Sequence, residues 1–265
     1  APPAPTPEEV AAHREALSRM IGPADIPALL GASPYRGSTP LGLYHRVRGE
    51  VAPRPASMRM KRGQALQPLI LRAWEEQTGR KVDPWPAEGR FLVHSVDGLH
   101  LRCTPDALTL RDDVGLAGEP VEVKAWGDHV RLDDADSHEL VSLQIQVIAQ
   151  VHVLRDCGLT MSHVGHTAVL RDHDDAPTVG VVDADTPLTR DLWGVVVRTL
   201  GDFWNRVREG RPPEMQGADA EVVREVYRTA TPGKTFILPA EGGPLVAAWE
   251  EARAARLAAE KGVEP

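Results

Sequence analysis

The chain has 265 residues, of which 42% are hydrophobic and 26% are charged, and its formal net charge is −8 at pH 7. This composition is ordinary for a soluble globular protein, and no apolar run approaches the roughly 20 residues needed to cross a bilayer, so we expect no membrane partner. The first residues lack the basic start and apolar core of a signal peptide, and two cysteines cannot build a disulfide framework. We therefore expect a cytoplasmic protein with one large domain or two small ones.

The N-terminal part of the chain is expected to be helical. Residues 1–7 are rich in proline and should form a tail. A helix should follow over residues 7–20, with Thr6 as its N-cap and acidic residues in its first turn. Two short helices, separated by a turn rich in glycine, serine and proline, are expected between residues 22 and 50.

A long helix is expected over residues 57–82, "SMRMKRGQALQPLILRAWEEQTGRKV". Its apolar residues recur every four positions from Leu66 to Trp74, and Gly79 supplies a stop. Pro68 lies inside this pattern, and its ring clashes with the carbonyl four residues earlier. The pattern therefore predicts a kink or a restart of the helix at that point.

Strands and helices alternate in the rest of the chain. Residues 90–110 are expected to form a hairpin with an Asp-Gly turn, and residues 119–126 a further strand. The remaining elements should be a helix, two strands and two helices, at residues 137–158, 163–170, 179–183, 186–213 and 244–261. This order predicts an α/β fold, with a central mixed β-sheet flanked by helices and a peripheral C-terminal helical extension.

The strand with the sequence "VEVKA" carries an acid and a base on one face. Val121 and Val123 alternate with Glu122 and Lys124, so the charged pair shares the face opposite the valines. Such a pair is either an ordinary solvated pair on a half-buried strand or part of a site with Asp106, which ends an earlier strand-like run. Two acids at adjacent strand ends, with a lysine beside one of them, suit metal-assisted hydrolysis of a phosphodiester.

Basic residues are concentrated between residues 36 and 62, where seven of them accompany the single acid Glu50. In an acidic protein, such a segment is what a phosphate-binding surface beside a carboxylate site would need. An ordinary solvated helix and loop can have the same composition. Both interpretations stay open on composition alone.

The order of several motifs resembles a known family. "TPDAL", "VEVKAW" and "LQIQV" follow one another as in the PD-(D/E)XK nucleases, and specifically in their YqaJ-type viral recombinase branch, which includes the phage lambda exonuclease. The upstream stretches "IGPADIPALLGASPY" and "RGQALQPLILRAWEEQTGRKV" resemble further motifs of that branch. The resemblance covers residues 18–215 and implies a restriction-endonuclease-like core there, between a tail and helix at 1–17 and a helical extension at 216–265.

The resemblance implies a catalytic site for Mg²⁺, with Mn²⁺ as a substitute. Lys124 would orient or deprotonate the attacking water, and Gln144 and Gln146 would face the site from the following helix. The implied metal ligands are Asp106, Glu122, the carbonyl of Val123 and, in the long helix, Gln67. The residues implied to hold DNA are Arg19, Arg36, Arg46, Arg59, Lys61, Arg62 and Gln146.

Two residues depart from the family pattern. Gln67 stands where relatives usually have a metal-binding glutamate, four residues after Gly63, and Ala24 stands where many relatives have serine. Glutamine keeps an oxygen ligand but lacks the charge. We therefore expect weaker binding of one metal ion.

The implied activity is exonucleolytic digestion of linear double-stranded DNA from its ends, 5′ to 3′, in phage-type recombination. The implied partners are DNA ends, a single-strand annealing protein and further copies of the chain, because relatives form rings. A different interpretation is a catalytically impaired relative that binds DNA ends or a recombination partner without cutting. A sequence-specific endonuclease on the same core is less favoured, because no separate recognition domain is visible.

Overall fold

The computed structural model describes residues 19–35, 38–51, 56–84, 92–96, 99–110, 117–226 and 242–261. Most of the helix expected over residues 7–20, together with Arg36, lies outside these described residues. The chain divides into two compact units, Ala1–Val226 and Tyr227–Pro265. In the part that the structure describes, no helix combines the length and apolar character needed to cross a bilayer.

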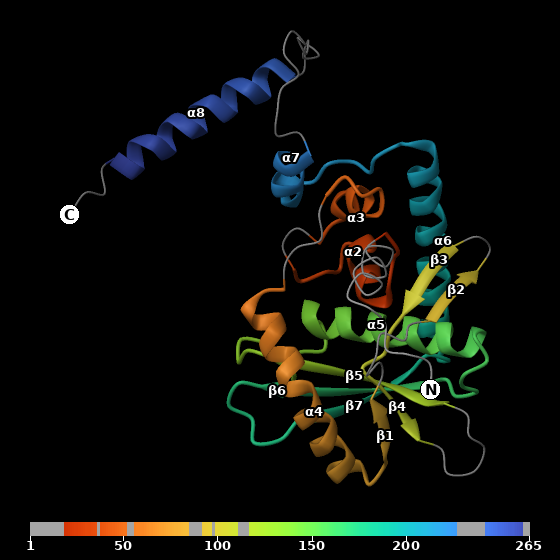
Figure 1. Cartoon of the computed structure of the whole chain (residues 1–265). Coiled ribbons are helices and arrows are strands. Elements are labelled where there is room, and N and C mark those ends of the chain that lie inside the picture. Colours follow the sequence, from red (N-terminus) through yellow and green to blue (C-terminus); the bar gives the residue numbers. More distant parts are fainter. Residues whose placement is uncertain are drawn as a thin grey trace, which may run out of the picture. The chain divides into compact units, whose positions relative to one another are not determined.

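A five-stranded mixed sheet forms the centre of the first unit (Figure 1). Its strands, in spatial order, are β1 (Val82–Pro84), β4 (Ala107–Leu110), β5 (Ala117–Trp126), β6 (Val164–Arg171) and β7 (Thr178–Asp183). β5 and β6 run parallel, and the other neighbours are antiparallel. This arrangement confirms the expected α/β fold with a central mixed sheet.

The segment expected as one hairpin over residues 90–110 is divided between two sheets. β2 (Leu92–Val96) and β3 (Leu99–Cys103) form a separate antiparallel pair, whereas β4 joins the central sheet. Pro105 lies between β3 and β4, and a proline has no amide to donate to a strand ladder. The break at Pro105 therefore lets the chain change sheets just before Asp106.

One long helix covers each face of the central sheet (Figure 1). α4 (Met58–Thr78) packs an apolar stripe that includes Trp74 against the valines of β5. α5 (His138–Asp156) packs Val147 and its neighbours against β6 and β7 on the other face. Because the two faces are covered by different helices, side chains that alternate along β5 enter different environments.

α4 is a single helix that continues through Pro68, so the expected restart does not occur. Pro68 removes the amide that would bind the carbonyl of Gln64. Both residues are exposed, so water can take the place of the missing donor. Ser57 caps the start of the helix by accepting the amide of Met60 at 3.2 Å, and Gly79 ends it with a φ of 68°, as the sequence predicted.

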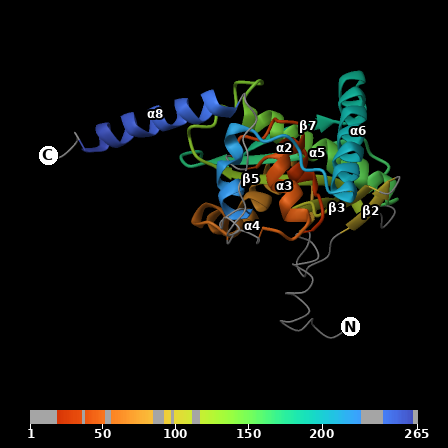
Figure 2. The same ribbon diagram turned by 90° about the horizontal axis from the view of Figure 1, so that it is seen from above.

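A second helical layer lies over α5, as the view from above shows (Figure 2). Its members are η1 (Pro23–Asp25), α2 (Ile26–Leu29), α3 (Pro40–Val47) and α6 (Pro187–Glu209). Their apolar side chains share one buried core with α5 and β3. This layer places the segment around Asp25 near β3, because Ile21 forms a backbone bridge with Leu101.

The first unit extends past the helix α6. η2 (Gly217–Asp219) and α7 (Ala220–Val226) belong to it, although the sequence analysis assigned them to the C-terminal extension. The hydroxyl of Thr39, at the start of α3, donates a hydrogen bond to the buried carboxylate of Asp219. This contact joins two segments that are 180 residues apart in sequence.

The second unit contains the helix α8 (Gly242–Lys261). Trp249 is 59% exposed, and the guanidinium of Arg253 lies 5.3 Å from the centre of its ring. The helix confirms the element expected over residues 244–261.

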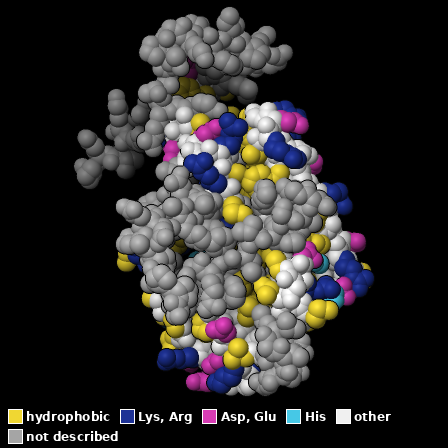
Figure 3. Space-filling model, turned by 45° about the vertical axis from the view of Figure 1, so that its right-hand side comes forward, with side chains coloured by type: hydrophobic (Ala, Val, Ile, Leu, Met, Phe, Trp, Pro, Cys, Tyr) yellow, Lys and Arg dark blue, Asp and Glu magenta, His cyan; other side chains and the backbone are white. Residues whose placement is uncertain are grey.

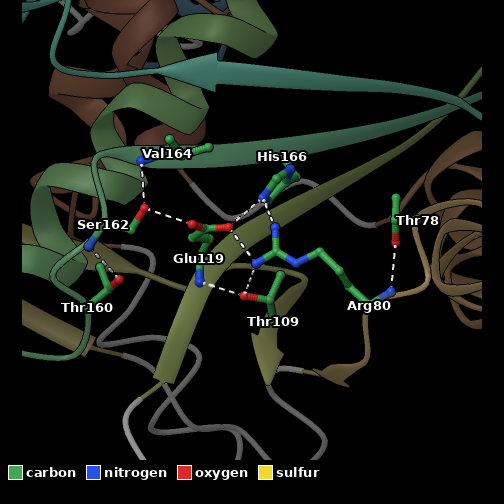
Figure 4. A network of polar contacts seen from close by, with 8 residues as sticks. All are labelled: Thr78, Arg80, Thr109, Glu119, Thr160, Ser162, Val164 and His166. Atoms are coloured by element: carbon green, nitrogen blue, oxygen red, sulfur yellow. Dashed lines mark hydrogen bonds and ion pairs between the residues drawn. The ribbon is translucent and has the colours of Figure 1, made fainter. Parts of the chain in front are cut away.

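A polar network fastens the start of β5 to three other segments (Figure 4). The carboxylate of Glu119 lies 2.7 Å from His166, 2.6 Å from Arg80 and 2.8 Å from the hydroxyl of Ser162. Burial alone would raise the pKa of Glu119, but these hydrogen bonds outweigh it and hold the pKa below its usual range. Thr109 completes the network by accepting from Arg80 at 3.1 Å. Strands β4, β5 and β6 are thereby joined to the end of α4.

Candidate active site

Glu122 and Lys124 are largely enclosed on the α5 side of the sheet. Glu122 is 3% exposed and accepts hydrogen bonds of 2.6 Å from the side-chain amides of Gln146 and Gln150 on α5. The ammonium of Lys124 is paired with the same carboxylate, and its side chain is 24% exposed. The neighbouring valines of β5 face α4 instead. Glu122 and Lys124 are therefore not an ordinary solvated pair.

Asp106 lies at the point where β4 separates from β5. The last backbone pair before it joins Ala107 to Val121, and the Oδ2 of Asp106 then accepts the amide of Val123 at 2.8 Å. The amide and carbonyl of one residue in a strand point to the same edge. The carbonyl of Val123 therefore points to the edge of β5 on which Asp106 lies.

Gln67 reaches Asp106 from α4. Its side-chain amide donates to Oδ1 of Asp106 at 3.1 Å, so both carboxylate oxygens of Asp106 have partners. The oxygen and nitrogen of a glutamine amide exchange places by a half-turn of the amide group. Gln67 can therefore offer either a donor or an oxygen ligand at this position.

The charges of the site are not balanced among its own residues. Burial and the nearby Glu122 raise the pKa of Asp106 to about 7, against the opposing influence of Lys124 and the Val123 amide. Burial alone would lower the pKa of Lys124, but the two carboxylates outweigh it and hold this pKa above its usual range. Lys124 therefore keeps its proton, and the two acids share a single cation.

The donor set fits a hard divalent cation. Asp106, Glu122 and the Val123 carbonyl present oxygen atoms, which Mg²⁺ and Mn²⁺ prefer, and a half-turn of the Gln67 amide would add another. The pKa of Asp106 is raised first by burial and then by the nearby Glu122, and a bound cation would favour the ionised form of both carboxylates. Among the described residues, no group of three or more His, Cys, Asp or Glu side chains is arranged to hold a metal. The ion would thus depend on two carboxylates, neutral oxygens and substrate phosphate.

The structure does not bring Gln144 to the carboxylates. Gln144 is exposed and lines a cavity of about 180 Å³ between α5, β6 and β7. Gln146 and Gln150 are one helical turn apart, so both lie on the face of α5 that contacts Glu122. Gln144 precedes Gln146 by two residues, which places it on a different face of the helix. Sequence analysis missed Gln150, although its spacing of four from Gln146 was a signal that could have identified it.

Two of the predicted DNA-binding arginines lie near β3. The guanidinium of Arg19 packs against Gly49, where a Cβ would lie 3.2 Å from Nη2. Arg46 forms an ion pair of 2.8 Å with Asp25. Sequence analysis missed Arg102, whose pKa is lowered by burial, with Asp25 and Arg46 acting in opposite directions. Asp25 thus lies close to both Arg46 and Arg102.

Three further predicted DNA-binding residues lie at the start of α4. Arg59 and Lys61 are exposed, and Arg62 forms an ion pair of 2.5 Å with Asp172, which follows β6. On the face of the molecule shown in Figure 3, basic and acidic side chains are interspersed among the coloured residues. Because Arg59 and Lys61 are exposed, the start of α4 can contact a phosphate backbone.

The fold is that of a known nuclease class. A crystal structure of an alkaline exonuclease (LHK-Exo) from Laribacter hongkongensis matches with a TM-score of 0.50 and 12% identity, over 85% of this chain and 100% of that chain. LHK-Exo in complex with dAMP matches with a TM-score of 0.49 and 13% identity, over 85% and 100%. At 12% identity, the first match shows a shared nuclease fold.

The family model of the YqaJ-like viral recombinase domain matches residues 11–160, which are more than half of the chain. The chain therefore belongs to the YqaJ-like viral recombinase domain family, and the resemblance seen in the motifs is confirmed. No curated protein shows a significant match to the chain.

Proposed function

We propose that the chain is a metal-dependent DNA exonuclease of the PD-(D/E)XK class, which hydrolyses linear double-stranded DNA from its ends in phage-type recombination. The observation that carries the proposal is that Asp106, Glu122 and Lys124 lie close together, at the edge of β5 toward which the Val123 carbonyl points. Family membership supports the recombination role, and the fold shared with an alkaline exonuclease supports the reaction. Digestion from 5′ to 3′ is part of the proposal.

In this proposal each residue of the site has a distinct task. Asp106, Glu122 and the Val123 carbonyl would hold Mg²⁺, or Mn²⁺ in its place, and the bound ion would lower the pKa of a water and offset charge on the phosphate. Lys124, which keeps its proton, donates hydrogen bonds that orient the water and stabilise negative charge on the phosphate oxygens. The two amides from α5 hold Glu122 in place, so its carboxylate is positioned before substrate binds.

The proposed substrate contacts and partners follow from the basic residues. The exposed start of α4, with Arg59, Lys61 and Arg62, would contact the DNA backbone, and Arg19 and Arg46 would contact a second part of it. Transfer of the remaining strand to an annealing protein, assembly of several copies around DNA and a cytoplasmic location belong to the same proposal.

One observation favours a second candidate function. Gln67 lacks the charge of a glutamate and donates its amide to Asp106 at 3.1 Å. A chain with a weakened metal site would bind DNA ends, or a recombination partner, without cutting. Gln67 thus makes a catalytically impaired DNA-binding protein the specific alternative.

A digestion assay distinguishes the two functions. Linear duplex labelled at the 5′ or 3′ end of one strand, and covalently closed circular duplex, would be incubated with Mg²⁺, Mn²⁺ or a chelator. We expect metal-dependent release of the 5′ label from linear DNA only, and loss of release in Lys124→Ala. Lys81→Ala is the matched control, because Lys81 is an exposed lysine paired with Glu75 on the surface.

Each outcome has a definite meaning. Release that persists in Lys124→Ala would refute the assigned site, and cleavage of closed circles would indicate an endonuclease. Intact DNA in every lane, with the protein still retarding linear duplex on a gel, would establish the binding protein. Release of the 3′ label first would reverse the proposed polarity.

A further inference from the structure

Arg62 and Asp172 form an ion pair between two segments that are distant in sequence. Arg62 lies in the second turn of α4, and Asp172 follows the last residue of β6. The Nη2 of Arg62 and the Oδ1 of Asp172 are 2.5 Å apart, and the side chains are 55% and 34% exposed. The pair is therefore accessible to solvent and to any ligand that approaches this surface.

The pair lies beside the carboxyl end of β5, the strand that carries the candidate site. Because β5 and β6 are parallel, their carboxyl ends meet, with Lys124 opposite Val169 and Trp126 opposite Arg171. Asp172 is thus just beyond the end of β5, and its Oδ2 lies 3.6 Å from the position of a Cβ on Gly127. Ligands of open α/β sheets bind in the crevice outside such carboxyl ends.

Arg62 also lies close to the metal-ligand candidate of its own helix. It precedes Gln67 by five residues, which is about 7.5 Å along the axis at a rise of 1.5 Å per residue. A DNA strand at the proposed site would therefore pass within reach of Arg62. Its guanidinium offers a fork of donors that fits either a carboxylate or a phosphate.

The other acids near Asp172 have partners of their own or face solvent. Asp174 pairs with Arg171 at 2.9 Å, and Asp128 pairs with His173. Asp175 is exposed, and among the described residues no ion pair joins it to α4. Among the described acids of this turn, Asp172 is thus the one that forms an ion pair with a residue of α4.

We propose that Asp172 is an internal competitor of DNA phosphate for Arg62, and so a residue that sets the stringency of substrate binding. This inference rests on the proposed function. While the pair is intact, Arg62 carries no net attraction for a passing strand, because the carboxylate neutralises it and repels phosphate. A phosphodiester that is held firmly by the rest of the site displaces the carboxylate, whereas loosely bound DNA does not.

The test measures DNA binding without cleavage. Binding of a labelled linear duplex would be followed by fluorescence anisotropy, in chelator, over a series of KCl concentrations. We expect Asp172→Asn to lower the Kd about two- to fivefold at low salt, which is the range of an exposed ion pair. The salt dependence should steepen by about one phosphate contact, because Arg62 becomes available to the backbone.

Two further variants keep the test specific. Asp175→Asn removes the same charge from the same turn without breaking the pair, so it should have a smaller effect. In an Arg62→Gln background, Asp172→Asn should no longer tighten binding, because the group that it releases is absent.

An unchanged or weaker affinity in Asp172→Asn would overturn the inference, as would an equal effect of Asp175→Asn. A gain that persists without Arg62 would overturn it too. Absence of binding by the unaltered chain at the lowest salt would refute the proposed function instead, and with it the inference.

Discussion

The substitution Gln67→Glu replaces one side-chain amide in the candidate metal site with a carboxyl group, and so tests directly whether residue 67 contributes to that site. In the structure, the Gln67 amide donates to Oδ1 of Asp106 at 3.1 Å. A glutamate of the same shape cannot donate when ionised, and it places a third carboxylate beside Asp106 and Glu122. The metal-free protein should lose stability, and the affinity for a divalent cation should increase.

The magnitude follows from the distances. Two unit charges 4 Å apart interact by about 4 kcal/mol at an effective dielectric constant of 20, and a lost hydrogen bond to a charged group costs about 1.5–3 kcal/mol. Uptake of a proton relieves part of this repulsion. We therefore expect the free energy of unfolding in chelator to fall by about 2 kcal/mol, and the Kd for Mn²⁺ to fall about tenfold, which corresponds to 1.4 kcal/mol.

Thermal unfolding in chelator and calorimetric titration with Mn²⁺ measure the two quantities. Gln77→Glu is the matched control, because Gln77 lies on the same helix and donates its amide at 3.1 Å to the carbonyl of Pro177, away from the carboxylates. A folded Gln67→Glu variant with the Mn²⁺ affinity of the unaltered chain would refute our placement of Gln67 at the metal. The same conclusion would follow if the two variants lost equal stability in chelator.

Other substitutions test the packing and polar contacts around the site. The low pKa of Glu119 means that its contribution to stability is present above the usual range of a glutamate and is lost as the pH falls through the folded pKa; Glu119→Gln should flatten that part of the curve of unfolding free energy against pH. Gln150→Leu removes a donor from the buried Glu122 and should cost about 1–3 kcal/mol in urea unfolding, whereas the exposed Gln144→Leu should cost almost nothing. Trp74→Ala removes a side chain that is 0% exposed, and should cost about 3–5 kcal/mol by the same measurement.

The local part of the site could be predicted from sequence because its signals are periodic. The alternation in "VEVKA" has the period of a strand, and the structure places Glu122 and Lys124 on one face of β5 as that period requires. The stop of α4 at Gly79 was likewise predictable, because glycine adopts a positive φ at low cost. Each of these features depends on neighbours within a few residues.

The remaining contacts depend on the meeting of distant segments. The amide of Val123 is bound by Asp106, and Arg62 is bound by Asp172, and no sequence period links either pair. The helix α5 is an intermediate case, because, of the two predicted glutamines, Gln146 contacts Glu122 and Gln144 does not, whereas Gln150, which was not predicted, does. The half-buried Arg102 had no local signal at all, since its environment is created by α3 and the segment around Asp25.

The network around Glu119 has a consequence for the interpretation of kinetics. β5 carries both this network and the proposed catalytic pair, with Glu119 three residues before Glu122. Burial lowers the pKa of His166 in the same network. As the pH falls, protonation of Glu119 and protonation of His166 therefore both weaken the contacts that fix β5 in place. The acid limb of a pH–rate profile would therefore combine loosening of the strand with protonation of groups that carry out the reaction. A profile recorded beside that of Glu119→Gln separates the two contributions, since only the first is altered by the substitution.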